Sequence, residues 1–363
     1  MLRVAVVGAN GFVGSRLVEQ WHLEERAKVV PVVRRPAAAA SALRFGVRCR
    51  VVDALDEHEL ARAFAGCDAV VHAGAGDRRF VTQSPARVVQ AAAQAGASTV
   101  VYLSSMAVHG WHPPAGTDET TSFPRRHPIP YNGWKARAER VLRGACRESG
   151  TRFVILRPGI VYGPRSQWIA GFARAVVEDS AYVVAGGRGV CNAIYVDNLV
   201  HAVGLGLERE EAADETFLVA DDDPVTWRML YEPVCRALGR SWDAVADLAP
   251  RAPRPTPGER LLALRNDPAA RVVLDRVPHA LRNSVRRLGV PRLAEEPPQD
   301  APRTPALETS ILQACDYRFP TAKARRMLGF EPPVAFDEAC RRTVAWLGFA
   351  GYPLAAAARS PAR

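Results

Sequence analysis

The sequence has very little lysine. Of its 48 basic residues only Lys28, Lys135 and Lys323 are lysines, and arginine supplies the rest. Because arginine provides positive charge almost everywhere else, the ammonium group four residues after Tyr131, in the stretch YNGWK (131–135), requires a specific explanation.

Features of exported, membrane-spanning and zinc-binding proteins are also missing. No apolar run reaches the ~18 residues that a membrane span needs, and the opening MLRVAVVGAN is typical of a first β-strand rather than of a signal peptide. The seven cysteines are odd in number and show no CxxC or Cys/His ligand spacing. We therefore expect a cytoplasmic protein with reduced thiols, no transmembrane segment and no bound metal.

The net charge of +10 is unevenly distributed. Residues 251–294 hold ten arginines against three acidic residues, which accounts for most of the excess. The simplest interpretation is a solvated arginine-rich surface, and the alternative is a surface for a phosphorylated substrate or an anionic membrane face. Nothing resembles a helix-turn-helix, a zinc finger or an aromatic RNA-binding pattern, so we expect no nucleic-acid partner.

Short runs of β-branched residues alternate with amphipathic segments of helical length. Strands are expected at residues 3–9, 28–34, 48–54, 68–74, 98–105 and 152–158. Strands separated by helices predict an α/β fold with a doubly wound parallel sheet of the Rossmann type. Beyond about residue 180 the alternation loosens, which predicts a smaller lobe that includes a helix opened by Thr226.

A glycine turn follows the first expected strand. The stretch GANGFVG places Gly8, Gly11 and Gly14, with Asn10 and Phe12 between them, before a helix that starts near Phe12. Such glycines permit a tight turn and let backbone amides and the helix N-terminus approach a pyrophosphate. In this context, between a strand and a helix, the pattern predicts a dinucleotide cofactor.

The end of the second strand indicates which dinucleotide is bound. Arg34 and Arg35 stand where an acidic residue would hold a ribose 2′-hydroxyl, and paired arginines suit a 2′-phosphate, so NADP is favoured over NAD. The alternative is that both are ordinary surface arginines. Asp53, at the end of the third strand, is expected to accept a hydrogen bond from an adenine amino group, with a helix N-cap as its competing role.

The expected domains follow from this order. Residues 1–180 form the NAD(P)-binding domain, residues 181–350 form a substrate-binding lobe from which some elements return to the first domain, and residues 351–363 form a tail. Within the lobe, residues 248–310 are rich in proline and arginine and show helical patterns only near 258–289.

Tyr131 and Lys135 lie on one face of an expected helix, because residues four apart are neighbours there. A nearby cation favours the phenolate of a tyrosine whose reference pKa is about 10, and a compact ammonium can also donate to ribose hydroxyls. Alone, this spacing occurs by chance in many helices. However, Ser104 and Ser105 end the fifth strand at the carboxyl edge of the sheet, where such a fold binds its ligands.

With these elements in order, the chain resembles the extended short-chain dehydrogenases/reductases of the NAD(P)-dependent epimerase/dehydratase family. The matching stretches are GxxGxxG at 8–14, VVHAGA at 70–75, LSSMAVHG at 103–110, YxxxK at 131–135, LRPGIVYGP at 156–164, YVDNLVHA at 195–202 and the closing PTAKARRMLGFEP. Each is modest alone, and their order makes the resemblance specific.

The resemblance implies a role for each matched residue. Tyr131 would be the general acid or base, Lys135 would lower its pKa and bind the nicotinamide ribose, and Ser105 would orient the substrate oxygen. Further cofactor contacts are implied for Ala73, Gly74, Pro158 and Gly159. The family also implies a homodimer in which helices near 84–96 and 131–148 pair across a two-fold axis.

Departures from the family pattern narrow the reaction. Ser105 is followed by Met106 and Ala107, whereas nucleotide-sugar dehydratases carry Asp and Glu there, so dehydration is disfavoured. The acidic pair within TDET (117–120) is expected to fix its loop. His109, where a tyrosine is usual, is expected to be packed or solvated, with substrate contact as the alternative.

The sequence thus predicts an NAD(P)-dependent oxidoreductase or epimerase that acts on a secondary alcohol or ketone. The leading substrate is a nucleotide-activated sugar, for whose diphosphate Arg165 and Arg188 are candidates. A hydroxysteroid-like or other lipid-like alcohol is the alternative. A non-catalytic NADP-binding sensor of the same fold would be expected to have lost Ser105, Tyr131 or Lys135.

Overall fold

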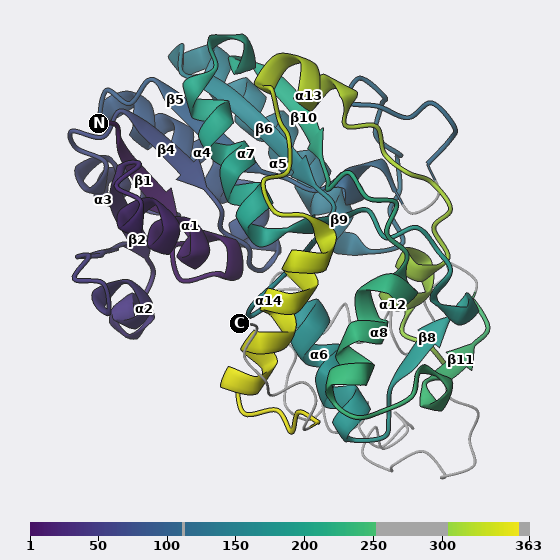
Figure 1. Ribbon diagram of the computed structural model, residues 1–363. Coiled ribbons are helices and arrows are strands. Elements are labelled where there is room, and N and C mark those ends of the chain that lie inside the picture. The colour runs from purple at the N-terminus through teal and green to yellow at the C-terminus, as the bar shows by residue number, and fades with distance from the viewer. Residues whose placement is uncertain (111–112, 252–303, 356–363) are drawn as a thin grey trace, which may run out of the picture.

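The structure is a computed structural model that describes residues 1–110, 113–251 and 304–355 (Figure 1). Its main sheet has seven strands in the order β10-β6-β5-β4-β1-β2-β3, and every neighbouring pair is parallel. The strands are β1 (Arg3–Val7), β2 (Lys28–Val33), β3 (Arg50–Val51), β4 (Ala69–His72), β5 (Thr99–Leu103), β6 (Arg152–Pro158) and β10 (Glu215–Val219).

All six strands expected from the sequence are present, and the seventh comes from further along the chain. β10 lies in the stretch that was expected to belong to the smaller lobe, and it pairs with β6 so that Phe217 lies opposite Leu156. Both residues are fully buried. Burial on both faces of β6 explains why a further apolar strand is recruited to its open side.

Helices cover both faces of this sheet, as the doubly wound prediction requires. One apolar layer packs side chains of α1, α7 and α13 against the strands, and the other packs α3, α4 and α5. These helices are α1 (Phe12–Leu23), α7 (Val196–Glu208), α13 (Ala322–Leu328), α3 (Glu57–Ala63), α4 (Arg78–Gln94) and α5 (Pro130–Ser149). The short α2 (Ala40–Leu43) follows β2 and joins the first layer. The Rossmann-type fold is therefore confirmed.

The smaller lobe lies at the lower right in Figure 1, beyond the carboxyl ends of the strands. Its helices and strands are α6 (Gln167–Val177), α8 (Trp227–Ala237), α12 (Leu307–Gln313), α14 (Phe336–Phe349), β7 (Ile160–Tyr162), β8 (Tyr182–Val184), β9 (Ala193–Tyr195) and β11 (Ala246–Leu248). Of these, β7 and α6 precede the expected boundary at residue 181, and they belong to the lobe because their side chains pack with those of α8 in one apolar cluster. Strands β7 and β9 form one two-stranded sheet, and β8 and β11 form another. As expected, Thr226 opens α8, and its hydroxyl accepts a hydrogen bond from the Met229 amide at 3.2 Å.

The expected tail differs in part from the structure. Leu354 is buried and the Ala355 amide donates to the Ala237 carbonyl at 2.8 Å, because the chain turns back onto the lobe after α14. Residues 356–363 lie outside the described residues, as do the helical patterns near 258–289 and all of the arginine-rich segment except Arg251.

No helix among the residues that the structure describes is long and apolar enough to cross a membrane. The same residues contain no group of three or more His, Cys, Asp or Glu side chains that could hold a metal ion.

Candidate active site

The glycine turn lies at the carboxyl end of β1, where the strand order reverses between β2 and β4. This is the point at which a doubly wound sheet leaves a crevice for ligands. Gly8 has φ +84°, and a Cβ there would come within 2.6 Å of the Gly74 Cα. A Cβ on Gly14 would overlap the Gly8 carbonyl oxygen. The glycine turn therefore packs so closely against α1 and the segment after β4 that Gly8 and Gly14 have no room for a side chain.

A large open pocket occupies this crevice and encloses about 1380 Å³, part of it open to solvent. It brings together eight of the residues expected to bind the cofactor, namely Gly8, Asn10, Gly11, Phe12, Arg34, Arg35, Ala73 and Gly74. The glycines keep the backbone accessible, and the N-terminus of α1 at Phe12 offers unpaired amides to an anion. These features fit a dinucleotide with its pyrophosphate at the start of α1.

Asp53 does not line this pocket, and its helix-capping alternative is wrong. Its Oδ1 accepts the Leu55 amide at 3.0 Å within an exposed turn. Helix α3 is capped by Asp56 instead, which accepts the Glu59 amide at 3.0 Å. Three residues separate Asp53 from the helix, so the nearer aspartate takes the capping position. The contact between Asp53 and adenine stays a prediction.

His72 contacts the wall of the large pocket from the protein interior. This role of His72 was not identified from the sequence. Its ring is buried, with Nε2 2.8 Å from the Ser84 hydroxyl, and Nδ1 accepts the Gly74 amide at 3.2 Å. Burial, together with the charge of Lys135, lowers the pKa of His72 to about 3. The ring is therefore neutral and holds Gly74 in the pocket wall through its acceptor nitrogen.

Lys135 is buried on α5 with 3% of its surface exposed. Its Nζ donates to the Leu103 carbonyl at 2.7 Å and to the Tyr102 hydroxyl at 3.2 Å. Burial lowers the pKa of Lys135 to about 8, and the charge of Glu139 acts in the opposite direction. The lysine thus fastens the helix that carries Tyr131 to the end of β5, two residues before Ser105.

Tyr131 lies in the first turn of α5, and its ring centroid is 6.0 Å from the Lys135 Nζ. From the sequence, Lys135 is expected to lower the pKa of Tyr131. Here burial, followed by the charge of Glu308, raises that pKa to about 12. Desolvation of the phenolate outweighs the nearby cation, whose hydrogen bonds go to β5. The phenol is therefore protonated near neutral pH.

Ser105 faces a second, largely apolar pocket. Its Oγ accepts the Ala107 amide at 3.2 Å at the start of a short 3₁₀ helix (Met106–His109). The pocket encloses about 540 Å³, part of it open to solvent, and Gly159 shares its wall. A Cβ on Gly159 would overlap the Asn192 carbonyl oxygen, because β7 and β9 meet there.

Most of the walls of this second pocket could not be identified from the sequence. Alongside Ser105 and Gly159 it is lined by Asn132, Ile160, Val190, Asn192, Trp227, Ile311, Leu312, Cys315 and Phe319, with Met106, Ala107 and Gly110. Only tertiary packing brings these segments together. Tyr131, Lys135, Gly14 and Pro158 line neither pocket, although Asn132, next to Tyr131, lines the second.

Two expectations about the loop after Ser105 are confirmed. His109 is buried, with Nε2 3.0 Å from the Arg157 Nη1, and burial lowers its pKa to about 4, so it is a packed, neutral histidine. The acidic pair fixes its loop: Asp118 accepts the Thr120 amide at 2.9 Å, and Glu119 Oε1 accepts the Leu218 amide at 3.0 Å.

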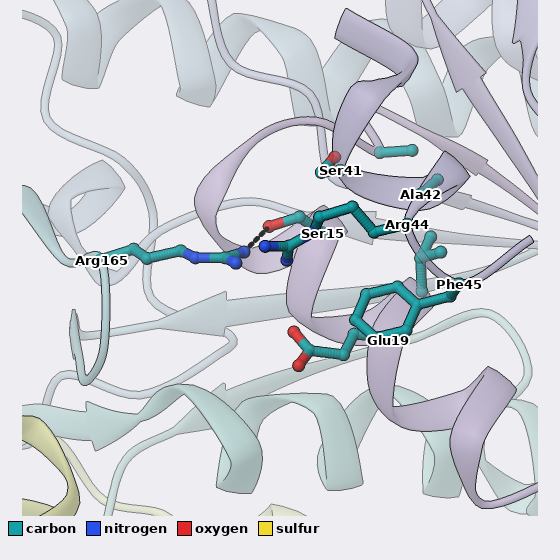
Figure 2. A pocket seen from close by; sticks show the side chains of 9 residues that line it. Ser15, Glu19, Ser41, Ala42, Arg44, Phe45 and Arg165 are labelled. Carbon is teal, nitrogen blue, oxygen red and sulfur yellow. Dashed lines mark hydrogen bonds between the residues drawn. The ribbon is translucent and has the colours of Figure 1, made fainter. Parts of the chain in front are cut away.

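The two arginines proposed for a substrate diphosphate do not line the pocket that contains Ser105. Arg165 reaches α1 instead, where its Nη1 donates to the Ser15 hydroxyl at 3.4 Å. Figure 2 shows this contact in a separate, closely packed hollow between α1 and α2, which is also lined by Glu19. Arg188 is exposed after β8.

The chain belongs to the NAD-dependent epimerase/dehydratase family, whose model matches residues 4–220. This match confirms the resemblance drawn from the motifs and, with it, an enzyme class that uses a nicotinamide dinucleotide.

Several proteins of known function are similar to the chain. A 3β-hydroxysteroid-dehydrogenase/decarboxylase (isoform 2) from Arabidopsis thaliana is 23% identical, covering 93% of this chain, which spans only 61% of that protein's length. An N-acetyl-α-D-glucosaminyl-diphospho-ditrans,octacis-undecaprenol 4-epimerase from Escherichia coli O157:H7 is 24% identical, covering 65% of this chain and 72% of the epimerase.

Solved structures share the fold over nearly the whole chain. A dTDP-glucose 4,6-dehydratase from Streptomyces venezuelae with bound NAD superposes with a TM-score of 0.69 at 21% identity, covering 96% of this chain and 97% of the dehydratase. A UDP-glucose 4-epimerase from Thermotoga maritima gives a TM-score of 0.67 at 19% identity, with 96% and 99% covered. At these identities the likeness establishes the fold alone.

Proposed function

We propose that the protein is an NAD(P)-dependent oxidoreductase or epimerase that transfers hydride at a secondary alcohol or ketone, with Ser105, Tyr131 and Lys135 as its catalytic residues. One observation carries the proposal. The buried Lys135 ammonium joins the helix of Tyr131 to the strand end that leads to Ser105. A buried lysine is costly, and in a purely structural role an apolar residue would serve better.

Each side chain has a defined task in this proposal. When bound, the nicotinamide supplies or accepts the hydride. The Ser105 hydroxyl donates to the substrate oxygen and holds it, and Tyr131 moves the proton. With a pKa of about 12, the protonated phenol suits proton donation during ketone reduction. In the oxidative direction the deprotonated side chain of Tyr131, the phenolate, accepts the alcohol proton and becomes the phenol. The Lys135 charge stabilises the phenolate.

A nucleotide-activated sugar is the first candidate substrate. It is supported by family membership and by the nucleotide-sugar enzymes among the solved structures that share the fold. The name of the 4-epimerase relative from Escherichia coli describes a sugar joined through a diphosphate to undecaprenol, so this relative supports a sugar diphosphate but not the nucleotide. A lipid-like secondary alcohol such as a hydroxysteroid is the second candidate. It is favoured by the apolar walls around Ser105, with Trp227, Ile311 and Phe319, and by the hydroxysteroid relatives that match 93% of the chain.

Turnover with one of these classes tests the proposed function. The purified protein is incubated with NAD or NADP and panels of nucleotide-sugars and hydroxysteroids. Reduced cofactor is followed by absorbance, and epimers, which form without net reduction, are followed by NMR. Tight dinucleotide binding with no turnover in either panel would support the non-catalytic sensor instead.

We propose that the cofactor is NADP, because the exposed Arg34 and Arg35 line the large pocket and can bind a 2′-phosphate. Replacing both by alanine is expected to weaken NADP binding by on the order of 10–100-fold and to leave NAD binding nearly unchanged. Calorimetric titration measures both affinities, and Arg48→Ala, an exposed arginine outside the pocket, is the matched control. Equal losses for both cofactors would refute a role in 2′-phosphate recognition.

We further propose a homodimer in the cytoplasm. The seven cysteines are all free, as expected in a reducing compartment. Helices α4 and α5 pack side by side on one face of the sheet and can pair with a second copy to form a four-helix bundle. Light scattering after size-exclusion chromatography is expected to give the mass of two 39.5 kDa chains, and a single-chain mass at all concentrations would contradict the dimer.

A further inference from the structure

A second buried charge lies on α5, one turn beyond Lys135. Glu139 is 1% exposed, and its carboxylate is fully engaged. Oε1 accepts the Ser104 hydroxyl at 2.5 Å and the Arg157 Nε at 2.9 Å, and Oε2 accepts the Arg157 Nη2 at 2.8 Å. All three contacts come from donor groups, the Ser104 hydroxyl and two nitrogens of the Arg157 guanidinium, so the carboxylate acts only as an acceptor.

These contacts connect three elements of the candidate site. Glu139 is on the helix of Tyr131 and Lys135, Ser104 precedes Ser105 at the end of β5, and Arg157 precedes Pro158 and Gly159 at the end of β6. One carboxylate therefore joins the catalytic helix to both strand ends. A purely structural link would not require a charge pair, because a buried ion pair contributes little net stability compared with apolar packing.

The Arg157 guanidinium also has partners on the side that faces away from Glu139, and these fix the position of the Glu139–Arg157 ion pair. Its Nη1 donates to the Glu119 carbonyl at 3.0 Å and lies 3.0 Å from the His109 Nε2. Because His109 is neutral, its Nε2 can accept this bond. The Arg157 guanidinium is thus held against Glu139, and the Glu139 carboxylate on α5 has a fixed position.

Lys135 needs such a charge because its direct partners are neutral. The Leu103 carbonyl and the Tyr102 hydroxyl accept from its Nζ, but neither carries a charge to balance a buried ammonium. Of the other titratable groups nearby, His72 is neutral and Tyr131 is protonated. Among the described residues, Glu139 is the group whose charge favours the protonated lysine.

We propose that Glu139 is a positioning residue, which keeps Lys135 protonated at neutral pH and fixes the helix of Tyr131 against the ends of β5 and β6. The consequence of Glu139 for catalysis rests on the proposed function. Its effect on Lys135 is a property of the folded protein and can be measured without any substrate.

The scarcity of lysine makes this measurement direct. Labelling with 13C-lysine gives three side-chain signals, which Lys28→Arg and Lys323→Arg assign. In the wild type the Lys135 signal is expected to titrate with a pKa near 8. In Glu139→Gln this pKa is expected to fall by about one unit, as when an opposite charge is removed nearby, while Lys28 and Lys323 stay unchanged. An unchanged Lys135 pKa in a folded Glu139→Gln protein would overturn the inference.

Glu139→Gln leaves the Arg157 charge buried without its partner, so the variant can fail to fold. The double variant Glu139→Gln/Arg157→Met removes both charges. Its Lys135 pKa is expected to fall by less than in Glu139→Gln, because the repulsion from the Arg157 guanidinium is lost together with the attraction to the carboxylate. Ser104→Ala keeps the ion pair and is the matched control, with the Lys135 pKa expected to be unchanged. If both Glu139 variants lose stability and leave Lys135 unaffected, Glu139 is merely structural.

The two proposals fail in different ways. A lowered Lys135 pKa with no turnover in any substrate panel leaves the role of Glu139 intact and removes the proposed function. With a substrate in hand, activity that needs the protonated lysine falls as pH rises through its pKa. The alkaline limb of the kcat/KM profile of Glu139→Gln is therefore expected to move to lower pH by about one unit, the same change as is expected in the NMR titration. An unmoved limb would contradict the catalytic consequence.

Discussion

Tyr131→Phe is expected to reduce hydride transfer by about 10²–10⁴-fold, because the variant keeps the ring and loses the only group proposed to exchange a proton with the substrate oxygen. The ring of Tyr131 packs against the apolar layer of α4 and α5, so phenylalanine fits the same space. Cofactor affinity is expected to stay within about threefold, since the large pocket does not include Tyr131. Single-turnover measurements of nicotinamide absorbance separate the chemical step from binding.

Tyr352→Phe is the matched control for this substitution. It removes a hydroxyl that donates to the Ala170 carbonyl at 3.0 Å in the smaller lobe, far along the chain from the candidate site. Its activity is expected to remain near that of the wild type. Full activity in Tyr131→Phe would rule out the proposed proton transfer, and an equal loss in both variants would indicate a general effect on folding.

Gly159→Ala is expected to destabilise the protein by about 3 kcal/mol or more, a large effect for one methyl group. The added Cβ would overlap the Asn192 carbonyl oxygen, to which the Ile160 amide donates at 2.7 Å. The nearest atoms, the Asn192 carbonyl oxygen and carbon, belong to the backbone, so the overlap can be removed only if β7 and β9 move apart. Since Gly159 also lines the pocket beside Ser105, the surviving folded fraction is expected to bind substrate weakly.

Gly171→Ala is the matched control and is expected to have the opposite effect on stability in the same measurement. Gly171 lies inside α6, where a Cβ meets nothing within 4 Å, so alanine is expected to stabilise the helix by about 0.5–1 kcal/mol. Urea unfolding followed by circular dichroism compares the two variants. Similar stabilities for both would contradict the close approach of the chain at Gly159.

Much of the fold could be predicted because its first half is locally regular. The expected strands at 3–9, 98–105 and 152–158 coincide with β1, β5 and β6, since buried parallel strands appear as compact β-branched runs. β10 was assigned to the lobe because nothing local in ETFLV distinguishes an edge strand of the main sheet from a strand elsewhere. Its place depends on the open side of β6, which only the assembled sheet provides.

The candidate site likewise has one part that the sequence could predict and another that it could not. The glycine turn and the YxxxK stretch are short, local patterns, and a large pocket lies around the first of them. The walls around Ser105 come from segments as distant as Asn192 and Phe319, which no spacing connects. The pKa of Tyr131 rises because burial decides it, and burial is a property of the folded surroundings rather than of a lysine four residues away.

The late position of β10 has a consequence for synthesis on the ribosome. The first six strands of the sheet are complete at Pro158, yet the strand that covers the open side of β6 ends only at Val219. While those intervening residues are being translated, β6 presents unpaired backbone groups and an uncovered apolar edge, the arrangement most prone to pairing with another chain. The edge of the sheet at β6 therefore stays unpaired until residue 219 has been translated.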